Sequence, residues 1–113
     1  MIELHESQSG DVTVISLSGK LDAATTPATE ARLVALAREG KKFLALDFSG
    51  VSYLASSGLR MLLVLTREIT SLEGGLVLCN LDDTMKGTLE VTGFLPYFRL
   101  ASSADEAIGL LRV

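Results

Sequence analysis

Two short apolar runs, each followed by a segment with helical spacing, constrain the fold of this chain most. They are FLALDF, Phe43–Phe48, and LVLC, Leu76–Cys79. Runs this short and this apolar are typical of central β-strands that other elements cover on both faces. Because strands that alternate with helices usually form a parallel or mixed sheet, the pattern predicts an α/β protein with helices packed against the sheet.

The rest of the predicted sheet comes from three less apolar segments. Ile2–Ser7 and Val12–Leu17 have strand character, and the QSGD between them is typical of a hairpin turn. A short extended piece, YFRLA, precedes the end of the chain. We therefore expect a mixed sheet of about four to five strands, in a single domain over 1–113, since 113 residues leave no room for a second core.

Four segments are predicted to be helices, because apolar residues recur in them at helical spacing and residues that favour helix termini flank them. The first has Thr26 as N-cap before Pro27 and stops at Gly40, and the second runs from about Ser56 to Leu72. The third starts at Asp82 and Asp83 and stops near Gly93. The fourth starts at an S-x-x-E capping box, Ser103 to Glu106.

Composition and charge exclude several classes of partner. The net charge is −4 with no basic patch, so we expect neither nucleic acid nor an anionic membrane surface as a partner. The longest apolar run, LRMLLVL, is far shorter than the roughly 20 residues of a membrane span. One cysteine and an N-terminus without signal-peptide features indicate a reducing compartment, and we expect the cytoplasm.

The residues that could carry catalysis are few and scattered. His5 has no cysteine or carboxylate at metal-ligand spacing, and Cys79 lies within an apolar strand with no basic neighbour. Asp82 and Asp83 are better explained as helix cap and dipole partner than as paired acid–base groups. No phosphate-binding glycine loop is present. The sequence therefore predicts a protein that is not an enzyme and has no catalytic residue, cofactor or metal site.

One polar interruption of the apolar pattern, in YLASSGLRML, invites a functional interpretation. Ser56, Ser57 and Gly58 follow the predicted loop SGVSYLA and open the second helix. A serine there can cap the helix, which is worth about 1 kcal/mol. The same position suits a phosphate, which the fold would tolerate at a helix N-terminus but which would repel a partner docked over it. The residues alone leave both interpretations open.

Several segments, in a fixed order, resemble the STAS domain, and most closely the stand-alone anti-sigma factor antagonists of bacteria. The resemblance covers nearly the whole chain. It rests on SGKLDAATTP (Ser18–Pro27), on LDFSGVSYLASSGLRMLL (Leu46–Leu63), on VTGF (Val91–Phe94) and on the ending ADEAIGLL.

The resemblance implies a non-enzymatic regulator that binds an anti-sigma factor, itself a serine kinase, and so releases a sigma factor. Phosphorylation by that kinase weakens binding, and a phosphatase restores it. The phosphoacceptor position falls on Ser56, with Ser57 as the alternative. Asp22 matches the family's loop aspartate. The residues that match or adjoin the partner-facing helix start are Ser57, Gly58, Leu59, Arg60 and Met61.

Two positions depart from the family pattern. Ala55 stands where the family has an aspartate directly before the serine, and Arg60 stands where some members have glycine. Met61 and Leu65 fall off the predicted sheet-facing side of the helix, which carries Leu59, Leu62, Leu63 and Ile69. They could form an adaptable partner patch or belong to a broad core contact.

Other functions remain open at this point. The chain could be a STAS interaction subunit of a transporter, lipid-trafficking or signalling complex without sigma-factor control. It could also be a nucleotide or small-molecule sensor, with the ligand near Asp22 and Ser56. An enzyme with Ser56 as nucleophile would lack a positioned base. We expect the free protein to be a monomer.

Overall fold

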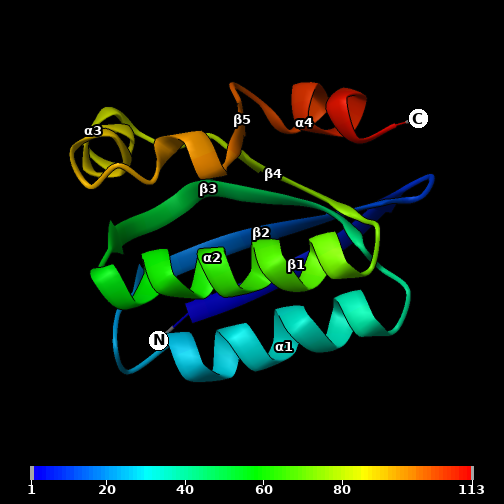
Figure 1. The fold of residues 1–113 in the computed structure, drawn as a ribbon, viewed down its shortest axis with the longest axis horizontal. Coiled ribbons are helices and arrows are strands. Elements are labelled where there is room, and N and C mark those ends of the chain that lie inside the picture. Colours follow the sequence, from blue (N-terminus) through cyan, green and yellow to red (C-terminus); the bar gives the residue numbers. More distant parts are fainter. Residues whose placement is uncertain (1, 113) are drawn as a thin grey trace.

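A computed structural model describes residues 2–112 and contains one five-stranded sheet in the order β1-β2-β3-β4-β5 (Figure 1). β1 is antiparallel to β2, and all other neighbours are parallel. The strands are β1 (Ile2–Ser9), β2 (Val12–Leu21), β3 (Phe43–Leu54), β4 (Gly75–Cys79) and β5 (Arg99–Ala101). The predicted α/β fold with a mixed sheet is confirmed.

Helices cover both faces of this sheet (Figure 1). They are α1 (Thr26–Arg38), α2 (Ser56–Ser71), α3 (Asp83–Val91), the short 3-10 helix η1 (Leu95–Tyr97) and α4 (Ala104–Leu111). On β3, Leu44 and Leu46 pack with α1, α2 and α3, whereas Ala45 points to the opposite face and packs with α4. This alternation is the two-residue period of a strand, and it explains why FLALDF is apolar on both sides.

The predicted ends of β2 and β3 were wrong. The segment SGVSYL, predicted to be a loop, continues β3 and pairs with an extended β2 up to Leu21 and Leu54. The register between them shifts twice, which marks bulges. A Cβ on Gly50 would lie 2.7 Å from the carbonyl oxygen of Leu17, so only glycine lets the two strands stay this close.

The helix starts are partly as predicted. Asp82 caps α3 by accepting the N–H of Met85 at 2.8 Å, and Ser103 caps α4 by accepting the N–H of Glu106 at 3.1 Å. The N-cap of α1 is Thr25 rather than Thr26. The prediction placed the cap one residue too far along the chain. Thr25 is tied to the preceding turn, because its hydroxyl donates to the backbone carbonyl of Lys20 at 2.7 Å.

Two predicted partner-patch residues on α2 belong to the core. Met61 and Leu65 have exposed fractions of 1% and 0%. The helix packs against both the sheet and α1, and its buried side chains share one core cluster with residues of α3, so it buries a wider face than one sheet contact would require. The core interpretation of these residues is confirmed, and the partner-patch interpretation was wrong.

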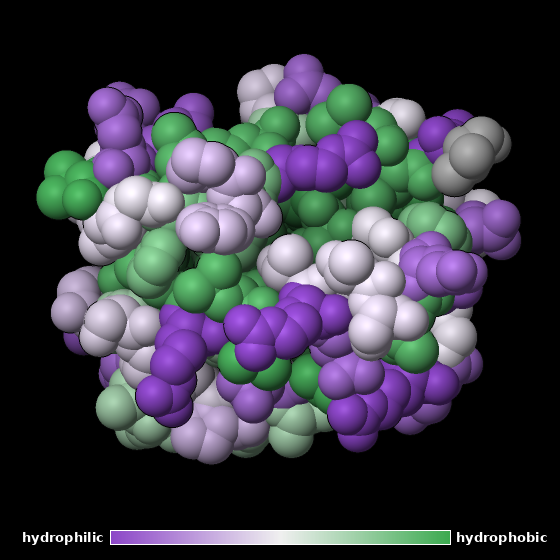
Figure 2. All heavy atoms as spheres, viewed as in Figure 1, coloured by the Kyte–Doolittle hydropathy of each residue, from purple (hydrophilic) through white to green (hydrophobic). Residues whose placement is uncertain are grey.

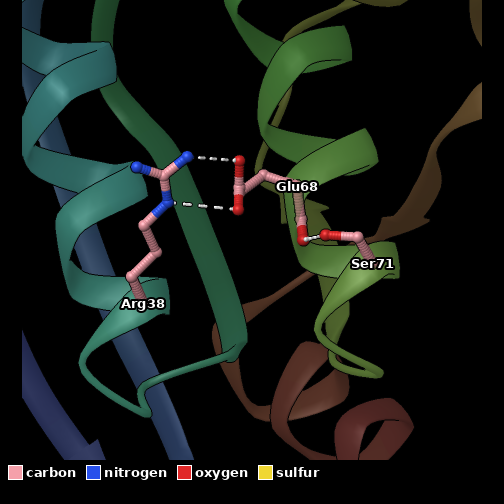
Figure 3. Close-up of polar contacts among 3 residues, drawn as sticks. All are labelled: Arg38, Glu68 and Ser71. Carbon is pink, nitrogen blue, oxygen red and sulfur yellow. Dashed lines mark hydrogen bonds and ion pairs between the residues drawn. The ribbon is translucent and has the colours of Figure 1, made fainter.

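One ion pair links the two adjacent helices. The guanidinium of Arg38, at the end of α1, donates from Nε and Nη2 to the two carboxylate oxygens of Glu68 on α2, at 3.2 and 3.0 Å (Figure 3). Ser71 lies one turn further along α2 and donates to the backbone carbonyl of Glu68. No helix within residues 2–112 has the length and apolar character to cross a bilayer.

Candidate functional site

The segments around Asp22 and Ser56, singled out in the sequence, meet at one edge of the sheet. β2 and β3 are parallel, so their carboxyl ends, Leu21 and Leu54, are paired neighbours. The backbone N–H of Ala55 then donates to the carbonyl oxygen of Leu21 at 2.9 Å. Asp22 and Ser56 are the next residues along each segment, and the fold therefore brings them to the same edge. In open α/β sheets this carboxyl edge is where binding sites usually lie.

Asp22 shapes the loop that follows β2. One carboxylate oxygen, Oδ1, accepts the backbone N–H groups of Ala24 at 3.0 Å and Thr25 at 3.1 Å. The hydroxyl of Thr25 in turn accepts the N–H of Asp22 at 3.1 Å. These bonds form a closed turn that leads directly into α1. Asp22 is half-buried, and part of its role is therefore internal.

The two serines occupy different environments. Ser56 is the first residue of α2 and is exposed, whereas the hydroxyl oxygen of Ser57 is buried and has no hydrogen-bond partner within residues 2–112. Of the two, Ser56 is therefore the hydroxyl that another protein can reach.

Neither serine caps α2, so the prediction of a serine cap was wrong. The N-cap position falls on Ala55, which has the extended backbone of a cap (φ −85°, ψ 172°) but a methyl side chain that accepts no hydrogen bond. The helix begins one residue earlier than a capping serine would require. The N–H groups in the first turn of α2 therefore donate no hydrogen bond to the side chain of the cap residue.

Gly58 permits a close approach, but the approaching group belongs to this chain. A Cβ on Gly58 would lie 2.6 Å from Cδ1 of Leu54 and 3.3 Å from both the Cβ and the carbonyl oxygen of Leu21. Gly58 and its neighbour Leu59 are buried, the latter with 2% of its surface exposed. The glycine thus seats α2 against the ends of β2 and β3.

Burial removes several residues from the predicted partner-binding surface at the start of α2. The side chains of Leu59 and Met61 lie in the core and have no surface to offer a partner. Arg60 is exposed one turn after Ser56 on α2, and Asp22 directly follows Leu21, whose carbonyl oxygen accepts the Ala55 N–H. Three of the predicted partner residues, Gly58, Leu59 and Met61, therefore support the surface from beneath, which corrects the prediction that they contact a partner directly.

Tyr53 is a surface residue that the sequence reasoning missed. It has 54% of its surface exposed and is the penultimate residue of β3, three positions before the first residue of α2. A hollow of about 110 Å³ separates it from α3 and is lined by Ser52, Tyr53, Leu54, Asp82, Thr84, Met85 and Thr88. Exposed tyrosines are enriched in protein interfaces because they combine apolar area with a polar hydroxyl.

Of the residues considered for catalysis, His5 lies on the edge strand β1, apart from this site, and Cys79 is inaccessible. His5 is exposed on β1, 3.8 Å from a carboxylate oxygen of Glu3. Cys79 is fully buried, and burial together with the charge of Asp47 raises the pKa of its thiol to about 11. Burial acts to raise the pKa of Asp47, but hydrogen bonds from Asn80 and Ser49 outweigh it and lower that pKa. Within residues 2–112, no three histidine, cysteine or acidic side chains are grouped to hold a metal ion.

Another surface hollow lies away from Ser56. It measures about 440 Å³ and is lined by Leu63, Thr66 and Arg67 of α2 and by Phe94 and Tyr97. Figure 2 shows apolar side chains gathered in the recess between α2 and the α3–η1 segment. The recess brings together no group of catalytic side chains. The carboxyl edge around Ser56 therefore remains the candidate site, because the residues predicted from the sequence lie there.

Comparisons with known proteins agree with this fold. A family model for the STAS domain matches residues 4–107. BtrV of Bordetella bronchiseptica, assigned as an anti-sigma factor antagonist, is 32% identical over 94 residues, which are 83% of this chain and 81% of BtrV.

Two solved structures extend the comparison. An anti-sigma factor antagonist from Mycobacterium paratuberculosis superimposes with a TM-score of 0.89 at 26% identity, covering 100% of this chain and 96% of that one. The phosphorylated form of the Bacillus cell fate determinant SpoIIAA superimposes with a TM-score of 0.74 at 25% identity, covering 97% of this chain and all of that one (100%). On this evidence the chain belongs to the STAS domain family, in the group of its anti-sigma factor antagonists.

Proposed function

We propose that this protein binds an anti-sigma factor through the carboxyl edge around Ser56, thereby freeing a sigma factor, and that phosphorylation of Ser56 ends the binding. The observation that carries the proposal is the exposed hydroxyl of Ser56 on the first turn of α2, above a buried and closely packed base formed by Gly58, Leu59 and Met61.

This geometry suits a switch that changes binding without unfolding the domain. A phosphate adds a charge of about −1.5 to −2 at neutral pH. At the start of α2 that charge would meet the positive end of the helix dipole, which favours anions. The core beneath is already packed and needs no rearrangement, so the added charge would act mainly on the docked partner.

The proposed partners are a serine-kinase anti-sigma factor and a phosphatase. In the kinase step, the hydroxyl oxygen of Ser56 forms a bond to the γ-phosphorus of ATP, ADP leaves, and the serine proton is released. The phosphatase hydrolyses the phosphoserine and restores the free hydroxyl. The existence of a phosphorylated form of SpoIIAA supports this cycle. We place the exchange in the cytoplasm, where sigma factors act, and expect a monomer when no partner is bound.

The first experiment mixes the purified protein with candidate serine-kinase anti-sigma factors and ATP. Intact mass and fragment spectra would locate any phosphate, and calorimetry would measure binding before and after the reaction. Ser56→Ala should bind but accept no phosphate. Ser57→Ala is the matched control, because the Ser57 hydroxyl is buried, and it should still be phosphorylated at position 56.

The outcomes separate the proposal from its competitors. One phosphate on Ser56 together with loss of binding establishes the switch. Tight binding with no phosphate under any condition makes this an antagonist without a switch. Neither binding nor phosphate with any candidate would reject sigma-factor control, in favour of a STAS interaction subunit of a transporter, lipid-trafficking or signalling complex.

A further inference from the structure

Arg60 is a cation without an anionic neighbour on its own helix. It is exposed on α2, and the residues three and four positions away from it are Ser56, Ser57, Leu63 and Val64. None of these carries a carboxylate, and no acidic oxygen of residues 2–112 lies within 4.0 Å of its guanidinium. Arg38 on α1, by contrast, is held by both oxygens of Glu68.

The start of α2 also lacks any acid of its own. Ala55 at the N-cap provides no acceptor, and the first turn contains no Asp or Glu. The first turns of α3 and α4 do contain acids, namely Asp83 in α3 and Asp105 and Glu106 in α4. Both the N-terminal end of α2 and the guanidinium one turn later are therefore uncompensated until an anion is added at Ser56.

We propose that Arg60 is the internal counterion of a phosphate on Ser56, an inference that rests on the proposed function. Residues four apart on a helix face the same side, with Cβ atoms about 5–6 Å apart, and an anion placed N-terminal to its cation is the favourable order. The planar fork of an arginine matches two phosphate oxygens, and such charge-assisted bonds are among the strongest hydrogen bonds in proteins.

The pairing gives the phosphate a second effect on the partner. Without phosphate, Arg60 is exposed and free to bind a carboxylate of a docked anti-sigma factor. With phosphate on Ser56, the guanidinium turns back to its own helix. The modification thus adds negative charge to the docking edge and at the same time withdraws its cation from the partner.

Other charged groups at this edge also affect the pKa of a phosphate on Ser56. They are Lys20 and Asp22 beside the Ala55–Leu21 hydrogen bond, and Asp82 and Asp83 at the start of α3. Carboxylates near a phosphate raise its second pKa, whereas a paired cation lowers it. All four are unchanged in variants of Arg60, so the contribution of Arg60 can be measured by itself.

The test uses phosphoserine built into position 56 during translation, which requires no kinase. The second pKa of the phosphate is followed by ³¹P NMR in the parent protein, in Arg60→Gln and in Arg67→Gln, an exposed arginine two turns further along α2. The pKa should be lower in the parent than in Arg60→Gln by about half a unit, roughly a three-fold change in proton affinity. Arg67→Gln should match the parent. Equal pKa values in the parent and Arg60→Gln would overturn the proposal.

A second readout separates pairing from a structural role of Arg60. Phosphorylation should raise the melting temperature more in the parent than in Arg60→Gln, while the two unphosphorylated proteins melt alike. Equal gains in both proteins would reject the pairing. Because neither measurement involves a kinase, a negative result leaves the kinase experiment intact, and failure of the kinase experiment does not alter the ³¹P result.

Discussion

The backbone N–H of Ala55 donates to the carbonyl oxygen of Leu21 at 2.9 Å, and this bond joins the two segments of the site. Leu21 is the last residue of β2 and directly precedes Asp22, and Ala55 lies between the end of β3 and Ser56, the first residue of α2. The bond holds the start of α2 against the end of β2, so the backbone that carries the exposed Ser56 is fixed in position. Single substitutions can test predictions about the start of α2, about the buried Cys79 and about the contact between α1 and α2.

Gly58→Ala should destabilise the protein by about 1 kcal/mol. The new methyl group would meet Leu54 at 2.6 Å and the Leu21 carbonyl at 3.3 Å, and such overpacking costs about 1–3 kcal/mol. The better helix propensity of alanine offsets at most about 1 kcal/mol of this. Urea unfolding followed by circular dichroism measures the difference.

Gly87→Ala in α3 is the matched control for that substitution. Nothing lies within 4 Å of a Cβ at this position, so only the propensity gain acts, and stability should rise by about 0.5–1 kcal/mol. If both substitutions stabilise the protein, Gly58 is not held by close packing.

Ala55→Asp should stabilise the protein by about 1 kcal/mol, because it supplies the missing side-chain acceptor at a backbone already shaped for a cap. Thermal and urea unfolding would show the gain. Ala55→Asn tests whether capping or charge is responsible, since it offers the same acceptor without a charge. An effect of the aspartate alone would assign the gain to the helix dipole rather than to the cap.

Cys79 should resist alkylation in the folded protein. Its thiol is buried, and its raised pKa of about 11 leaves almost no thiolate at about pH 8. Iodoacetamide, with mass spectrometry as readout, should label the native protein far more slowly than the urea-unfolded protein. Labelling of both forms at the same rate would contradict the burial of this strand.

The same thiol makes stability depend on pH at the alkaline end. An unfolded cysteine ionises near pH 8.5, whereas the folded one keeps its proton up to about 11. Its contribution is therefore fully present below about pH 8.5 and is lost as the pH rises through about 11. Cys79→Ala should show a shallower loss of unfolding free energy over this interval than the parent. Parallel curves would assign the loss to other groups.

The Arg38–Glu68 pair should respond to acid in the opposite sense (Figure 3). The hydrogen bond from Arg38 lowers the pKa of Glu68. Its contribution is present above the pKa of unfolded glutamate and is lost as the pH falls through the lower folded value. In Arg38→Gln, a carboxyl ¹³C titration should find a higher pKa for Glu68. Arg32→Gln, an exposed arginine on the same helix, should leave that pKa unchanged.

Local patterns in the sequence were sufficient wherever one segment determines its own structure. The apolar period placed the two central strands, and the caps of α3 and α4 were found because Asp82 and Ser103 bond within their own first turns. The predictions failed where distant segments meet. SGVSYL became strand because β2 was available to pair with it, and the cap of α2 fell on Ala55 because the Leu21 carbonyl fixes the backbone there.

The sequence by itself determined the order and type of the elements and the serine pair at the start of α2, because periodicity and helix signals are local properties. Only the tertiary structure decided which of those residues face outward. Packing α2 against the sheet and α1 buried Leu59 and Met61 and left Ser56 and Arg60 exposed one turn apart. Parallel pairing of β2 with β3 brought Asp22 to the same edge of the sheet. Exposure depends on what covers a residue, and the covering groups come from elsewhere in the chain.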